Sequence, residues 1–98
     1  MERVRNYETM FVLGPDLEEE DREKIMDRIK NVITGNDGEI KNTDEWGTRR
    51  MAYEVNDYTS GYYTVVNFEG RTGIVSELEH VYKIMDQVIR HLIVREDD

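Results

Sequence analysis

The middle of the chain reads Trp46-Gly47-Thr48-Arg49-Arg50-Met51-Ala52-Tyr53 and, after a short loop, Gly61-Tyr62-Tyr63-Thr64-Val65-Val66-Asn67-Phe68. Both blocks are strand-like, and successive side chains of a strand point to opposite faces of its sheet. The two adjacent arginines should therefore lie on opposite faces. A tryptophan followed by Gly47 predicts an interruption or bulge in the first strand of this pair.

Helix and strand patterns lie on both sides of this central pair. A strand is expected from Tyr7 to Leu13, with Tyr7, Phe11 and Leu13 on one face, and Gly14-Pro15 ends it. Asp16 is a candidate N-cap with Glu19 three residues later, and helical spacing continues to the turn at residues 35–38. A second helix would carry its inward residues at Ile74, Leu78, Val81, Tyr82 and Met85. The remaining strands are expected at residues 39–55, 61–69 and 88–95.

This order predicts an α+β fold of the ferredoxin-like split βαβ kind, βαββαβ, with a four-stranded antiparallel sheet and two helices on one face. The first and third strands should be central. Ninety-eight residues suit a single domain, 1–98, in which residues 96–98 form a short acidic tail.

Composition limits the function. The chain is 38% hydrophobic and 36% charged, which is typical of a soluble globular protein. No membrane-length apolar run or export signal is present, so we expect a cytoplasmic protein without a membrane partner. The net charge of −9 argues against a broad basic surface that binds nucleic acid alone. Arginines on the expected strands could still form one locally basic edge.

The sheet face opposite the helices is unusually apolar. If Thr64, Val66 and Phe68 face the helices, the residues between them face outward, and such an exposed apolar patch commonly marks an interface. We predict that a protein partner contacts Met10, Val12, Tyr63, Val65 and Leu92, with Val94 nearby. Two alternatives are a parity slip at a bulge and a face that curls to shield itself.

The arginine pair also has two interpretations. Arg49 and Arg50 could contact phosphate or bases through their forked guanidinium groups. Alternatively, they could pair with cross-strand carboxylates such as Glu8, Glu45 or Glu54. Tyrosines, Tyr7 among them, could stack on unpaired bases, although aromatic residues at these spacings are more often packing residues.

No catalytic or metal-binding pattern stands out, and we expect neither an enzyme nor a cofactor. The zero cysteines exclude disulfides and thiolate ligands. His80 and His91 do not have the spacing of a metal pair and are expected to be half-buried packing residues. The first strand-to-helix turn has Asp16 where a phosphate cradle would need an arginine. The RNA-recognition-motif signature also fails, at Ser60, Tyr63 and Thr64.

Five segments together resemble the bacterial small-subunit ribosomal protein S-six family. They are Arg5-Asn6-Tyr7-Glu8, Gly14-Pro15-Asp16-Leu17, Trp46 to Tyr53, Gly61-Tyr62-Tyr63 and Asp86-Gln87-Val88-Ile89-Arg90. The resemblance implies binding to the central domain of small-subunit ribosomal RNA, as a heterodimer with a basic partner of the S-eighteen type. The chain would then act in the ribosome, and its partner would supply much of the basic surface.

We assign RNA contact to Arg3, Arg5, Tyr7, Arg49, Arg50 and Arg90. The family often has basic residues where this chain has Met85 and Gln87, and a proline where it has Glu54, which leaves Arg90 as the best candidate at that end. We expect the isolated chain to be a monomer that binds RNA weakly. A regulatory or small-ligand binding module of the same fold is the alternative.

Overall fold

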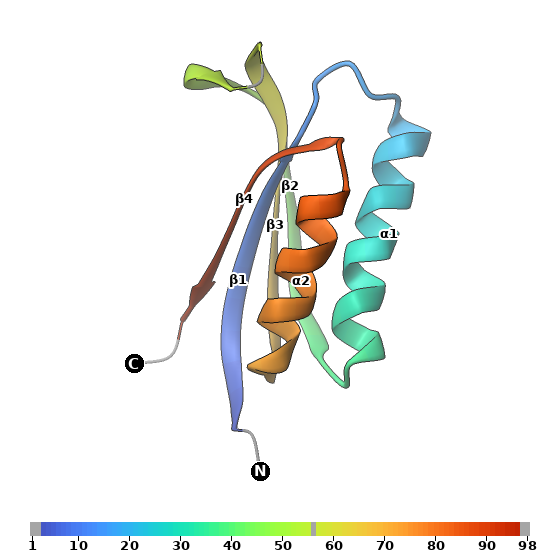
Figure 1. Cartoon of the computed structure of the whole chain (residues 1–98), viewed down its shortest axis with the longest axis vertical. Helices are drawn as coiled ribbons and strands as arrows, with labels where there is room; N and C mark the ends of the chain where they lie inside the picture. Colours follow the sequence, from blue (N-terminus) through green and yellow to red (C-terminus); the bar gives the residue numbers. More distant parts are fainter. Residues whose placement is uncertain (1–2, 56, 97–98) are drawn as a thin grey trace.

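The computed structural model describes residues 3–55 and 57–96. Its elements are β1 (Val4–Leu13), α1 (Glu19–Gly35), β2 (Glu39–Val55), β3 (Tyr58–Arg71), α2 (Gly73–Ile84) and β4 (Val88–Arg95). The strands form one antiparallel sheet in the order β2-β3-β1-β4, and both helices cover the same face (Figure 1). The predicted split βαβ fold is thus confirmed, with β1 and β3 central. Within the described residues, no helix is long and apolar enough to cross a membrane.

The core lies between the helices and the sheet. Phe11 and Leu13 on β1 and Val66 and Phe68 on β3 are fully buried there, as the predicted strand parity requires. The helices contribute Ile25, Met26, Ile29, Ile33, Ile74, Leu78, Val81 and Tyr82. Removing these apolar side chains from water is the main driving force for folding.

The first helix starts later than the sequence predicts. Residues 14–17 form a β-turn in which the Leu17 N–H donates to the Gly14 carbonyl, and Pro15 occupies the second position, which its fixed φ favours. Helix α1 therefore begins at Glu19, and Asp16 is not its N-cap, because the competing turn uses that residue. Glu18 precedes the helix without a side-chain cap.

The β2–β3 hairpin is longer than expected, because β3 begins at Tyr58 and not at Gly61. Register shifts occur in β2 between Ile40 and Asn42, between Glu45 and Gly47, and after Arg50. Gly47 has a positive φ of 83°, which confirms the predicted interruption. Bulges increase local twist, and the far end of the hairpin curls away from the helices beyond their ends (Figure 1).

The end of the chain stays attached to the sheet through residue 96. The Glu96 N–H donates to the Asn6 carbonyl at 2.8 Å, which continues the pairing of β4 with β1. The other two residues of the expected acidic tail, 97 and 98, lie outside the described residues.

Candidate functional site

The open face is the face of the sheet turned away from both helices. The register sets Met10 opposite Val65 and Leu92, and Val12 opposite Tyr63, so all five predicted partner contacts lie on this face. Leu92 is 52% exposed, and Met10 and Tyr63 are half-buried. These three residues offer apolar surface to a partner, as does the exposed Val94.

Val12 and Val65, in contrast, are already buried within the chain. Val12 is fully buried and Val65 is 6% exposed, so the expectation that both are exposed is wrong. Both lie on central strands with a neighbour on each side, and the backbone at Gly61 packs closely on Val12. A Cβ at Gly61 would come within 2.3 Å of the Val12 Cγ1 atom. The open face is therefore partly shielded by its own chain, which was one of the two alternatives that the sequence left open.

An aromatic pair extends the apolar surface to the edge strand β2. Trp46 stacks on Tyr63 with ring centroids 6.0 Å apart and planes 11° apart. Its Nε1–H donates to the Asp44 carboxylate at 3.1 Å, and the ring remains exposed. From the sequence, Trp46 was expected only to anchor the hairpin or a bulge. The bulge between Glu45 and Gly47 is what turns this ring toward the open face.

Carboxylates surround the apolar surface. The Asn67 side-chain amide donates to Glu8 at 3.3 Å and to Glu96 at 3.0 Å, which holds both carboxylates at the open face. Asp44 lies opposite Val65 on the same face. The open face thus combines apolar groups with fixed negative charges, while Arg90, opposite Val12, adds one positive charge near the end of β1. The part of the face around Glu8 and Glu96 suits a basic protein and repels phosphate.

The described arginines are not paired with described carboxylates. In residues 3–55 and 57–96 the ion pairs join Lys24 to Glu20, Lys41 to Glu39 and His91 to Glu79, and none involves an arginine.

Arg49 and Arg50 are exposed and lie opposite Gly61 and Ser60, on opposite faces of the strand. The cross-strand pairing considered for them is thus not seen within the described part of the chain. Their donors remain available for a partner.

Two other predicted RNA contacts have neighbours within the chain. Tyr7 is 5% exposed and stacks on Phe68 with centroids 5.4 Å apart, so its ring belongs to the core and is not available to stack on a base. Its position on the helix-facing side of a central strand explains this burial. The Arg90 guanidinium lies 5.7 Å from the centroid of the Tyr53 ring, and both side chains are exposed.

The structure separates the predicted RNA contacts into two groups. Arg3 and Arg5 lie at the start of β1, whereas Arg90 lies opposite Val12 near its end, seven residues from Arg5 or about 23 Å along the strand. Arg49 and Arg50 lie at that same far end. Arg71, opposite Val4, and Arg95, opposite Tyr7, were not assigned to RNA contact from the sequence, and both lie near Arg5. Only the strand register could have shown this.

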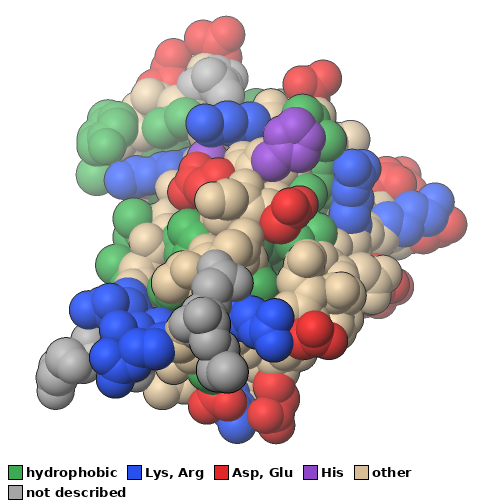
Figure 2. Space-filling model, turned by 60° about the horizontal axis from the view of Figure 1, so that its bottom comes forward, with side chains coloured by type: hydrophobic (Ala, Val, Ile, Leu, Met, Phe, Trp, Pro, Cys, Tyr) green, Lys and Arg blue, Asp and Glu red, His purple; other side chains and the backbone are tan. Residues whose placement is uncertain are grey.

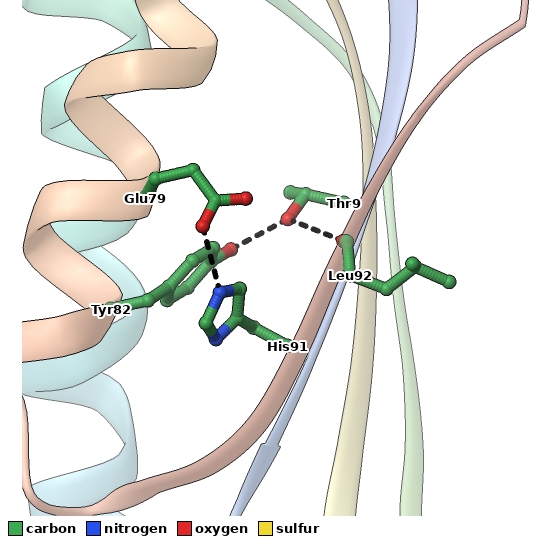
Figure 3. Close-up of polar contacts among 5 residues, drawn as sticks. All are labelled: Thr9, Glu79, Tyr82, His91 and Leu92. Carbon is green, nitrogen blue, oxygen red and sulfur yellow. Dashed lines mark hydrogen bonds and ion pairs between the residues drawn. The ribbon is translucent and has the colours of Figure 1, made fainter.

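A buried polar network joins α2 to the sheet (Figure 3). The Tyr82 hydroxyl and the Thr9 Oγ1 atom are 2.7 Å apart, and the Thr9 hydroxyl donates to the Leu92 carbonyl at 3.2 Å. Because Thr9 has one hydroxyl hydrogen, Tyr82 must be the donor to Thr9. Burial raises the pKa of Tyr82 above its ordinary value.

His91 also belongs to this network. Its Nε2 atom lies 3.0 Å from a Glu79 carboxylate oxygen, and its ring stacks on Tyr82 with centroids 4.8 Å apart. His91 is half-buried and has a packing role, as expected, whereas His80 is exposed, contrary to expectation. In the described part of the chain, no group of three or more His, Asp or Glu residues could hold a metal ion.

A hollow of about 350 Å³ lies between α1 and β2. Its charged lining has both signs: Glu19, Glu23, Asp27 and Glu45 with Arg22 and Lys30. The Arg22 guanidinium is already engaged, since it lies 4.3 Å over the Tyr62 ring and donates to the Leu17 carbonyl. This lining does not single out a class of small ligand, so the ligand-binding alternative gains nothing from it.

Comparison with known proteins gives the same family from sequence and from structure. The family described as ribosomal protein S6 matches residues 6–95. Small ribosomal subunit protein bS6 of Thermoanaerobacter pseudethanolicus is 50% identical over 95 residues, which are 97% of this chain and all of that protein. The bS6 protein of Moorella thermoacetica is 47% identical over 92 residues, 94% of each chain.

The crystal structure of 30S ribosomal protein S6 from Thermotoga maritima superposes with a TM-score of 0.91 at 34% identity, over 96% of this chain and 89% of that one. An uncharacterized protein from the same organism, with a TM-score of 0.57 and 14% identity, shares the fold alone. The resemblance found in the sequence is thus confirmed. Because the agreement extends over nearly the whole chain, the protein belongs to the ribosomal protein S6 family, a structural and non-enzymatic family of the small ribosomal subunit.

Proposed function

We propose that the chain, as a protein of the small ribosomal subunit in the cytoplasm, binds the central domain of small-subunit ribosomal RNA together with a basic partner protein of the S-eighteen type. The chain alone should be a monomer with weak affinity for RNA. The observation that carries the proposal is the open face, where exposed apolar side chains are surrounded by carboxylates.

A basic protein fits this face better than RNA does. Leu92 and Val94 expose apolar surface on the edge strand β4, and Trp46 does so on the opposite edge strand, β2. A few residues dominate the energetics of protein interfaces, and tryptophan is prominent among them. The carboxylates of Glu8 and Glu96 would meet lysine or arginine side chains of the partner.

The charge balance explains why the partner is needed for RNA binding. A net charge of −9 repels phosphate, while affinity for RNA depends on neutralising phosphates with basic side chains. A basic partner on the open face would cover carboxylates and add positive charge. The unpaired arginines of this chain could then contribute to a joint RNA surface.

The test uses the Leu92→Asp variant in capture of a purified partner protein of the S-eighteen type. Leu92 is 52% exposed, so the charge should leave the fold intact and weaken capture at least tenfold. Ile84→Asp is the matched control, because Ile84 is 53% exposed but lies at the end of α2. Equal capture by wild type and Leu92→Asp would refute the proposed face, as would an equal loss in both variants.

RNA binding is tested with a transcript of the central domain. Filter binding should show weak retention by the chain alone and tight retention when the partner protein is added. Thermal unfolding of each variant, alone, checks that the fold is retained. Tight and specific RNA binding by the chain without any partner would contradict the proposal.

A further inference from the structure

Four arginines come together at the end of the sheet where β1 begins. Arg71 lies opposite Val4 and Arg95 lies opposite Tyr7, so both flank Arg5 on β1, and Arg3 directly precedes this strand. We call Arg3, Arg5, Arg71 and Arg95 the terminal arginine cluster. Its strand positions, from Arg3 to the pair of Arg95 with Tyr7, span about 13 Å along β1 and about 10 Å across three adjacent strands. Lys and Arg side chains gather at the lower left of Figure 2, which brings this end of the molecule forward.

The carboxylates described near the cluster form no ion pair with its arginines; they are Glu8, Asp37, Glu39, Glu69 and Glu96. Glu8 and Glu96 are held by Asn67 on the open face. Asp37 lines the same hollow of about 200 Å³ as Arg71 but forms no ion pair with it. Like charges held close together raise the free energy of the free protein, and an anion that binds them relieves this repulsion.

We propose that the terminal arginine cluster contacts the phosphate backbone of the RNA, and that Arg71 and Arg95 are contact residues. This inference rests on the proposed RNA-binding function and names the part of the surface that carries it. Guanidinium forks match phosphate oxygens in geometry. Because the charges are spread over three strand ends, they suit the repeated charges of a polymer better than a single small anion.

The opposite end of the sheet is a weaker candidate for this role. There the Arg90 guanidinium is directed to the Tyr53 ring, and Arg49 and Arg50 point to opposite faces. Their donors therefore do not converge on one surface, whereas Arg5 and Arg95 of the cluster share the face of Tyr7 and only Arg71 has the parity of the other face. Arg71, opposite Val4, lies six residues or about 20 Å along the strand from Met10, so RNA on the cluster and a basic protein over Met10 and Leu92 can bind together.

The test compares variants of the chain in complex with its basic partner protein and a central-domain transcript. Arg71→Gln/Arg95→Gln removes two cluster charges, and Arg28→Gln/Lys83→Gln is the matched control. Arg28 and Lys83 are exposed on the helices and form no described ion pair, so both doubles change the net charge equally. RNA affinity is measured at several salt concentrations, partner capture is measured without RNA, and thermal unfolding checks the fold.

We expect Arg71→Gln/Arg95→Gln to weaken RNA binding about a hundredfold, roughly tenfold for each arginine. The slope of log affinity against log salt should become shallower by about two, one for each lost phosphate contact. Partner capture should not change. The variant Arg71→Lys/Arg95→Lys should keep most of the salt dependence of RNA binding but only part of the affinity.

Three results would overturn the inference. One is that the cluster double and the control double bind RNA equally well. Another is that only an Arg49→Gln/Arg90→Gln variant loses affinity, which would place the contact at the other end. The third is that the cluster double loses partner capture without RNA, which would make the cluster a protein contact. If wild type with its partner fails to bind RNA at all, the proposed function itself fails, and this result is distinct from the other three.

Discussion

Replacing Thr9 by Val should destabilise the fold more than replacing its hydrogen-bond partner Tyr82 by Phe. Both side chains are buried, and the hydrogen bonds run in one direction, from the Tyr82 hydroxyl to Thr9 and from the Thr9 hydroxyl to the Leu92 carbonyl. In Thr9→Val, the buried Tyr82 hydroxyl loses its acceptor. In Tyr82→Phe, Thr9 still donates to Leu92 and loses only one incoming bond.

These differences set the expected magnitudes. An orphaned buried hydroxyl costs about 1 to 3 kcal/mol, so Thr9→Val should lower the free energy of unfolding by about 2 kcal/mol. Loss of one ordinary hydrogen bond in Tyr82→Phe should cost about 1 kcal/mol. The double variant removes both hydroxyls, orphans neither of them, and should cost only about 1.5 kcal/mol. The coupling between the two sites is then about 1.5 kcal/mol.

Urea denaturation followed by far-UV circular dichroism measures the four free energies of unfolding. Thermal unfolding should agree, since 1 kcal/mol shifts the midpoint by about 4 to 8 °C in a domain of this size. Additive costs in the double variant, with Tyr82→Phe at least as damaging as Thr9→Val, would refute the hydrogen-bond direction and the coupling inferred from it.

Three further changes test other parts of the structure. Because burial raises the pKa of Tyr82, the unfolded chain ionises first above a pH of about 10, so stability should fall as pH rises there. Urea denaturation over this range should show a shallower fall in Tyr82→Phe. Val65→Asp should lower the free energy of unfolding by at least about 3 kcal/mol, because it buries an unpaired charge. A thermal unfolding curve like that of wild type would show instead that the centre of the open face is exposed. Gly61→Ala should lower the free energy of unfolding by about 1 to 3 kcal/mol, because the new methyl group clashes with Val12. Gly35→Ala is the control and should not change stability, because no atom lies within 4 Å of its new methyl group. Equal melting temperatures of the two variants would refute the close packing at Gly61.

The order of the elements and the side chains that face the helices follow from the sequence alone. Alternation along β1 placed Phe11 and Leu13 inward, and helical spacing placed Ile74 and Leu78 against them, as the structure confirms. Periodicity is a local property, so the sequence carries it without knowledge of the neighbours. The interruption at Gly47 was predicted from the glycine itself, and the opposite faces of Arg49 and Arg50 from strand alternation.

The helix start, the burial on the open face and the grouping of the arginines were decided by a competing local turn and by the register of the strands. The turn at residues 14–17 took Asp16 from the helix start, although the capping pattern was present. Val12 and Val65 have the parity of exposed residues, but their neighbours on both sides bury them. Likewise, Arg5, Arg71 and Arg95 become neighbours only because three antiparallel strands align their ends. Burial and charge clustering depend on which residues of neighbouring strands lie side by side, and only the tertiary structure fixes these positions.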